Sequence, residues 1–219
     1  MSAVKGLPRD TGARAYHSPL REERARRTRH DILTAAQALF VERGFARVSV
    51  ADIAVEAGVA RATVLSVFTS KAALLRAVVD VAMAGDDEPV PIAERPAVQA
   101  IRDEPDVRRK ITLFAEGLAQ RQARSAAVQI LIRDGRHVDD SLAPVWAALQ
   151  REGLTGMTAL GRHLLDTGQL REGLTIEQVR DILWNYLAID AYERLVLIQG
   201  WSQQRYSNWL AHTMVSALQ

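Results

Sequence analysis

Apolar residues recur at intervals of three and four residues along nearly the whole chain, and no segment alternates as an amphipathic strand would. The stripes occupy residues 32–40, 111–118, 142–164, 179–187 and 206–217. Residues able to cap a helix stand before several of the expected helices, and they are Ser49, Ser70, Thr175 and Ser202. Periodicity and caps together predict an all-α protein.

The segment "DDEPVPIAERP", residues 86–96, interrupts the helical pattern with prolines and an acidic run. It predicts a boundary between a first domain over residues 23–85 and a larger helical domain over residues 86–219. Residues 1–22 mix Gly, Pro, Ser and Arg without periodicity, which is typical of a flexible basic arm. In the second domain, one helix is expected to run from the cap at Thr175 to Gly200.

The formal net charge is only +2, but the charges are unevenly distributed. Residues 1–76 contain 13 Lys and Arg against 7 Asp and Glu, a net charge of +6. Residues 77–219 contain 15 against 19, a net charge of −4. A basic N-terminal third on a mildly acidic remainder predicts a polyanionic partner for the first part only.

Several classes of site are excluded by composition and spacing. The chain contains no cysteine, which excludes disulfides, thiol chemistry and the usual zinc-finger ligands. No apolar run approaches the roughly 18–20 residues that span a bilayer, and none follows the basic N-terminus as in a secretory signal. We therefore expect a cytoplasmic protein without membrane association. Metal-like spacings in "HVDD", residues 137–140, and at His163 with Asp166 lack a third ligand, so neither metal nor cofactor is expected.

The most informative stretch is "VADIAVEAGVARATVLSV", residues 50–67, which predicts two short helices joined at Gly58. Ile53 and Ala54 of the first helix and Val64 of the second are expected to face the core. Small residues where two helices cross, with a glycine in the turn, are what a helix-turn-helix requires, here over residues 49–68. Its second helix can lie in a major groove with its N-terminal residues toward the base edges.

Residues 28–75, "TRHDILTAAQALFVERGFARVSVADIAVEAGVARATVLSVFTSKAALL", resemble the DNA-binding domain of TetR-type transcriptional regulators. The C-terminal "GWSQQRYSNWLAHTM" is similar to the last helix of many members. The resemblance implies a three-helix DNA-binding domain and a homodimer that pairs through its last two helices on a palindromic operator in double-stranded DNA. It also implies a pocket in the second domain for a small-molecule effector that releases a repressor from that operator.

Eight residues are candidates for DNA contact, namely Arg29, Ser49, Arg61, Ala62, Thr63, Leu65, Ser66 and Lys71. Lys71 resembles the family's phosphate-binding lysine, and a Ser49 hydroxyl at a helix start is well placed for a phosphate. Leu65 stands where the family usually has a tyrosine whose hydroxyl contacts a phosphate. A leucine can touch only a thymine methyl, which predicts a lower affinity or an unusual operator. The alternative for Arg61 and Thr63 is a solvated helix face, and the alternative for Ser49 is a role as an N-cap alone.

Six residues of the second domain are candidates for the effector pocket, namely Phe114, Arg133, Trp146, His163, Trp184 and Tyr186. The aromatic ones would line it, and Arg133 and His163 would supply its polar groups. For each aromatic residue the alternative is an ordinary place in the core.

Two other functions remain open on the sequence. A TetR-like fold with weakened DNA contact would act as an anti-repressor or protein-binding regulator, and Leu65 supports this alternative. An all-α enzyme is disfavoured because no nucleophile–base or carboxylate constellation is assembled. Salt-dependent binding to random duplex DNA would separate a DNA-binding protein from an enzyme.

Overall fold

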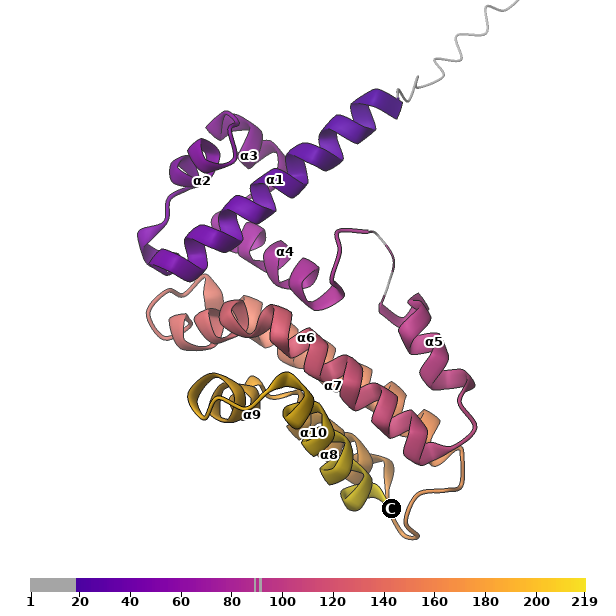
Figure 1. Ribbon diagram of the computed structural model, residues 1–219. Helices are drawn as coiled ribbons and strands as arrows, with labels where there is room; N and C mark the ends of the chain where they lie inside the picture. Colours follow the sequence, from indigo (N-terminus) through magenta and orange to yellow (C-terminus); the bar gives the residue numbers. More distant parts are fainter. Residues whose placement is uncertain (1–18, 89, 91) are drawn as a thin grey trace, which may run out of the picture.

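The computed structural model describes residues 19–88, 90 and 92–219, so most of the arm expected over residues 1–22 lies outside the described residues. All secondary structure in the described part is helical, which confirms the all-α prediction (Figure 1). The elements are α1 (Pro19–Arg43), η1 (Phe45–Arg47), α2 (Val50–Glu56), α3 (Arg61–Val67), α4 (Lys71–Ala84), η2 (Ile92–Glu94), α5 (Pro96–Asp103), α6 (Val107–Gly135), α7 (Leu142–Leu165), α8 (Ile176–Leu187), α9 (Ile189–Tyr192), the π-helical η3 (Glu193–Ile198) and α10 (Gln203–Leu218).

The first helix begins earlier than the sequence pattern indicates. Residues 19–22, which the sequence pattern places in the arm, form the first turn of α1. Proline is favoured at the first position of a helix, because the N–H that it lacks would have no partner within the helix. Glu22, in the first turn, complements the positive end of the helix dipole. The basic run that follows is therefore presented along one continuous helix.

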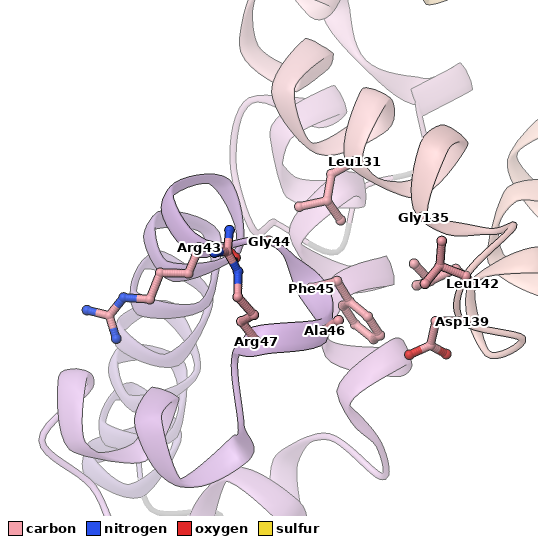
Figure 2. Close-up of a pocket in the computed structure, with 10 residues that line it drawn as sticks. Arg43, Gly44, Phe45, Ala46, Arg47, Leu131, Gly135, Asp139 and Leu142 are labelled. Atoms are coloured by element: carbon pink, nitrogen blue, oxygen red, sulfur yellow. The ribbon is translucent and has the colours of Figure 1, made fainter.

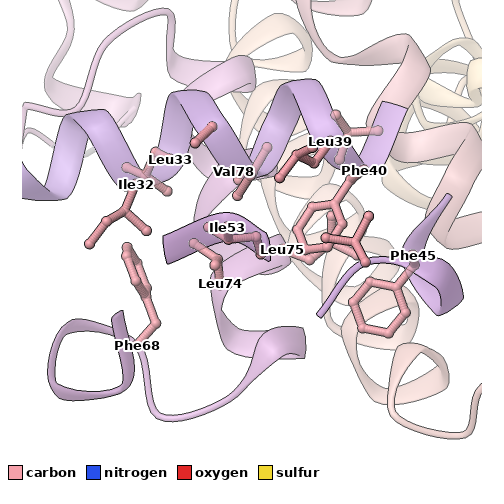
Figure 3. Packing of buried hydrophobic residues seen from close by; sticks show 14 of the residues in the cluster. Ile32, Leu33, Leu39, Phe40, Phe45, Ile53, Phe68, Leu74, Leu75 and Val78 are labelled. Atoms are coloured by element: carbon pink, nitrogen blue, oxygen red, sulfur yellow. The ribbon is translucent and has the colours of Figure 1, made fainter. Parts of the chain in front are cut away.

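Helices α1 to α4 enclose a common apolar core (Figure 3). Ile32 and Phe40 of α1, Ile53 of α2, and Leu74 and Leu75 of α4 are fully buried in it. Burial of one such side chain contributes about 1.5–3 kcal/mol relative to exposure. The inward positions predicted for α2 and α3, with Ala54 and Val64 among them, are confirmed. This core holds the two short helices, which are too short to be stable alone.

The same core continues into the second domain. Val128 and Ile132 of α6 and Leu142 of α7 are buried in the cluster that contains Phe40 and Leu75. The Arg124 guanidinium of α6 also donates to the last carbonyls of α4, those of Ala82 and Met83, at 3.1 Å each. The proline-containing break at residues 86–96 therefore interrupts the helical pattern but does not end the first core, which continues into α6 and α7.

A second core lies among α6, α7, α8 and α10 (Figure 1). Tyr206 of α10 is fully buried there, and its hydroxyl donates to Oε1 of Gln122 on α6 at 2.9 Å. The same glutamine donates from Nε2 to the carbonyl oxygens of Tyr186 and Ala188, at 3.3 and 3.4 Å. A buried amide thus links the last helix to the end of α8.

The prediction of a single helix from Thr175 to Gly200 is wrong, because the helix is interrupted at Ala188. The Thr175 cap is confirmed, since its hydroxyl accepts from the backbone N–H of Gln178 at 3.3 Å. Beyond α8, the helix resumes as α9 and continues as the π-helical η3. Gln122 satisfies carbonyls freed at the break, a contact between residues more than 60 positions apart that helical periodicity does not reveal.

Candidate DNA-binding surface and effector region

Helix α3 exposes most of its surface. Val64 is its only buried residue, while Arg61, Ala62, Leu65 and Ser66 are exposed and Thr63 is partly so. Gly58 makes the turn before it with φ of +65°, a left-handed conformation that favours glycine. The structure therefore brings five of the eight DNA candidates together on one short helix.

The outward side chains of α3 are small or uncharged apart from Arg61. The Ser66 hydroxyl donates to the carbonyl oxygen of Thr63 at 2.8 Å, so its proton is already used within the helix. Leu65 is 37% exposed and offers only apolar surface. The exposed face of α3 therefore carries one charged group, Arg61, and no carboxylate.

Ser49 forms the predicted capping box with Asp52. Its hydroxyl accepts from the Asp52 N–H at 3.1 Å and donates to Oδ2 of the same residue at 2.7 Å. The Ser49 hydroxyl and backbone N–H bonds hold the pKa of the Asp52 carboxyl below its ordinary value. The N-cap role is thus confirmed. The phosphate contact stays a prediction, with the hydroxyl proton already committed to Asp52.

Lys71 joins the start of α4 to the turn that precedes α2. Its ammonium donates to the carbonyl oxygens of Phe45 and Val48 at 2.9 and 3.0 Å, and lies 4.1 Å from the centre of the Phe45 ring. Two of its three protons are therefore held by the protein itself. One donor remains for the predicted phosphate contact.

Arg29, the remaining DNA candidate, pairs with an acidic residue after α4. Its Nε donates to Oδ2 of Asp87 at 2.9 Å, and its guanidinium lies 4.9 Å from the centre of the Phe68 ring. The partner is 58 positions away, so sequence reasoning missed it. Arg29 therefore connects α1 to the segment that leaves the DNA-binding domain.

A hollow of about 240 Å³ lies between the turn after α1 and the ends of α6 and α7 (Figure 2). Phe45, Leu131 and Leu142 line it, while the Arg43 side chain points away from these leucines. A second hollow of about 290 Å³ lies between α6 and α10 and is lined by Glu116, Ala119, Gln120, Gln203, Gln204 and Ser207. Neither hollow contains any of the six effector candidates.

The aromatic effector candidates are distributed over separate parts of the fold. Phe114 is buried in the second core, whereas Trp146 packs against the first, beneath the Arg136 guanidinium at 5.2 Å from its ring centre. Tyr186 contacts Trp209 edge-on, with ring centres 6.2 Å apart, and Trp184 is 37% exposed on α8. Phe114 and Tyr186 thus belong to the second core and Trp146 to the first, and their place in an effector pocket stays a prediction.

The polar effector candidates also have partners within the chain. Arg133 forms ion pairs with Asp134, Asp190 and Glu193 at 2.8, 3.1 and 2.8 Å. It ties α6 to α9 and η3 rather than pointing into a hollow. The hydrogen bonds that this guanidinium donates to the carboxylates of Asp134 and Glu193 raise its pKa further above its ordinary value.

His163 lies beside a lysine that sequence reasoning missed. Lys110 is 3% exposed and its ammonium donates to the carbonyl oxygens of Ile101 and Arg102 and to Nε2 of His163, at 2.9, 2.7 and 2.9 Å. Burial, followed by the neighbouring Lys110 charge, lowers the pKa of His163. A lysine has no lone pair when charged, so the imidazole must be neutral and accept at Nε2. The available signal was a lysine directly before Ile111 of an inward-facing stripe.

Neither a metal-binding cluster nor a single helix that could span a membrane occurs in residues 19–88, 90 and 92–219. No group of three His, Asp or Glu side chains in this part of the chain is arranged to hold a metal ion. No single helix described there is long and apolar enough to cross a membrane. Helices α3 and α4 together have the length and composition of a membrane span, but they meet at a bend of 66°.

Comparison with known proteins points to one family. The profile described as "Bacterial regulatory proteins, tetR family" matches residues 32–78. The HTH-type transcriptional regulator TtgR of Pseudomonas putida is 44% identical over 59 residues, which are 27% of this chain and 28% of that protein. The probable HTH-type transcriptional regulator ArpR of the same species gives the same figures. The match thus spans less than a third of these relatives.

Solved structures extend the similarity to the whole fold. The transcriptional regulator FadR from Bacillus subtilis, in complex with stearoyl-CoA, superposes with a TM-score of 0.68 and 19% identity over 87% of this chain and 99% of that one. A putative TetR-family regulator from Rhodococcus sp. gives 0.67 and 16% over 88% and 99%. At these identities the likeness concerns the two-domain helical fold alone.

Proposed function

This chain belongs to the TetR family of bacterial regulatory proteins, and from that premise we propose that it is a DNA-binding transcriptional repressor released from its operator by a small-molecule effector. The observation that carries the proposal is the exposed face of α3. It bears Arg61, small side chains and no carboxylate, and the apolar core beneath it holds it in place through Val64. Such a face suits a major groove.

The proposed homodimer is supported by apolar side chains left exposed on the C-terminal elements. Trp184 of α8 and Leu197 and Ile198 of η3 are 37%, 54% and 69% exposed. Leu197 and Ile198 are adjacent in η3, and adjoining exposed apolar side chains mark a candidate interface. A two-fold pair formed there would present two α3 helices to a palindromic operator.

The proposed effector site lies in the second domain. FadR from Bacillus subtilis, whose fold this chain shares, was solved in complex with stearoyl-CoA. We propose that this chain also binds a small molecule among its C-terminal helices. As a regulator that reads bacterial DNA, it would act in the cytoplasm and have no catalytic activity of its own.

Salt-dependent binding to random duplex DNA tests the proposal. Fluorescence anisotropy is measured across a salt series, and the logarithm of the affinity should fall linearly with the logarithm of salt concentration, because bound phosphates release counterions. Ovalbumin, an acidic protein without a DNA-binding surface, serves as the negative control. An affinity that does not respond to salt would overturn the proposal.

A further inference from the structure

One side of α6 faces the interior of the second domain and carries positive charge. Lys110, Phe114, Gly117 and Arg121 lie on this side, because they are separated by 4, 3 and 4 positions. Lys110 and Phe114 are buried, and Arg121 is partly buried. Two cations therefore occupy a face on which a soluble helix normally places apolar residues.

The Arg121 guanidinium lies against the Phe114 ring and close to Gly117. Its central carbon is 5.6 Å from the centre of the Phe114 ring. A side chain at Gly117 would bring its Cβ to 3.3 Å from Nη1 of Arg121, tighter than ordinary contact. Glycine inside a helix costs about 1 kcal/mol relative to alanine, so its presence here leaves room where the guanidinium lies against the helix.

No hydrogen bond or ion pair reaches the Arg121 guanidinium from the described residues, in contrast to its neighbours. Arg124 donates to two carbonyls at the end of α4, and Lys110 donates to two carbonyls and His163. Arg133 of the same helix forms ion pairs with three carboxylates. Among the described residues, the charge of Arg121 interacts with the Phe114 ring and with the like charge of Arg124.

The loss of water around this cation, with Arg124 as a second cause, lowers the pKa of Arg121 to about 10. It still carries its charge at neutral pH. A partly desolvated charge without a counter-charge is unfavourable in the folded state, and a cation perturbed in this way marks a candidate functional site. The described residues supply no counter-charge, and a bound anionic ligand would supply it.

We propose that Arg121 binds the carboxylate of an apolar organic acid, and that this acid is the effector of the repressor. The inference rests on the function proposed above, since it names the chemical class of that effector. A guanidinium holds a carboxylate with two parallel hydrogen bonds, and the Phe114 ring offers a surface for the apolar body of the same molecule.

The position of Arg121 also suggests how binding reaches the DNA. Arg124 lies less than one turn further along α6 and holds the carbonyls of Ala82 and Met83 at the end of α4. The first turn of α4 follows the recognition helix directly. An anion on Arg121 removes the repulsion between the two guanidinium groups, which changes the energetics of the Arg124 contact with α4.

Thermal unfolding of the full chain tests the proposal with octanoate as the probe and octanamide, which has the same length without the charge, as the control ligand. The variants are Arg121→Met, Arg124→Met and the exposed control Arg108→Met. Without ligand, Arg121→Met should melt about 2–4 °C higher than the wild type, because an unpaired charge is removed. Arg124→Met should melt lower because two carbonyls lose their donor, and Arg108→Met should be unchanged.

Octanoate should raise the melting temperature of the wild type and of Arg108→Met, and octanamide should not. Arg121→Met should lose the octanoate response. Three results would overturn the proposal: a lower melting temperature for Arg121→Met without ligand, an equal response of the wild type to both ligands, or an undiminished octanoate response in Arg121→Met. DNA binding is measured separately, so an absent DNA complex with an intact octanoate response would refute the repressor function and leave the anion site supported.

Discussion

The Lys71 ammonium donates to the carbonyl oxygen of Phe45 at 2.9 Å, which fixes the start of α4 against the turn that leads into the helix-turn-helix. The residue that the family resemblance assigns to a phosphate is therefore also part of the protein's own framework. Its two internal acceptors, the carbonyls of Phe45 and Val48, lie on the segment just before the Ser49 cap.

Replacing Lys71 by Met should lower the free energy of unfolding by about 1–3 kcal/mol, because both carbonyls lose their donor. Urea denaturation measures this, and the exposed Arg61→Met variant is the control that should leave stability nearly unchanged. If Lys71 served only a phosphate, Lys71→Met would keep full stability and lose only DNA affinity.

The Lys110–His163 contact makes stability depend on pH. Because the pKa of His163 is lower in the folded protein than its ordinary value of 6.5, the unfolded chain binds the proton more readily. The contribution of neutral His163 to the free energy of unfolding is constant above about pH 6.5. It is lost as the pH drops from there through the pKa of His163 in the folded protein. Protonation would also place two cations in contact, with Arg102 as a further positive neighbour and Asp166 as the only opposing charge among the groups that shift this pKa.

Urea denaturation between about pH 5 and pH 8 checks this for the wild type and for His163→Gln. The variant keeps an acceptor for Lys110 and cannot titrate, so its stability should fall less on acidification. Parallel pH profiles for the two proteins would show that His163 does not cause the dependence.

The proposed dimer surface can be tested without disturbing the core. Deleting residues 200–219 would not do so, because Tyr206, Leu210 and Met214 are fully buried within one protomer. Ile198→Glu instead places a charge on the exposed η3 surface and should weaken self-association on the order of tenfold or more. Analytical ultracentrifugation measures this, and Val138→Glu, at a residue 83% exposed outside the proposed surface, is the matched control. Equal dissociation constants for the two variants would place the interface elsewhere.

Leu65 predicts a gain of function. Leu65→Tyr restores a hydroxyl able to bond a DNA phosphate, which should strengthen binding by about 0.5–1.5 kcal/mol. Leu65→Phe is the control, since it adds the ring alone. Anisotropy titrations compare the two. A tyrosine no better than phenylalanine would mean that position 65 does not reach the backbone of the operator.

Local features of this fold could be predicted from the sequence, whereas contacts between distant segments could not. Ser49 with Asp52, and Thr175 with Gln178, cap their helices as expected because these contacts span three residues. The pairing of Arg29 with Asp87 and the break of the helix at Ala188, satisfied by Gln122, depend on how remote helices pack. The helix α3 could be predicted because its signals are local. The place of Arg121 beside Phe114 could not, because it depends on how α6 packs, and the six effector candidates stay a prediction.

The most direct test of the account compares the wild type with Arg61→Ala on DNA that flanks the gene, with random duplex of equal length as reference. The exposed Arg108→Ala is the control variant. The account predicts that the wild type binds one flanking palindrome more tightly than random DNA, and that Arg61→Ala loses about 1–3 kcal/mol at that site, while Arg108→Ala keeps its affinity. Equal affinity of the wild type for flanking and random DNA, together with an unchanged affinity in Arg61→Ala, would contradict the claim that α3 reads an operator.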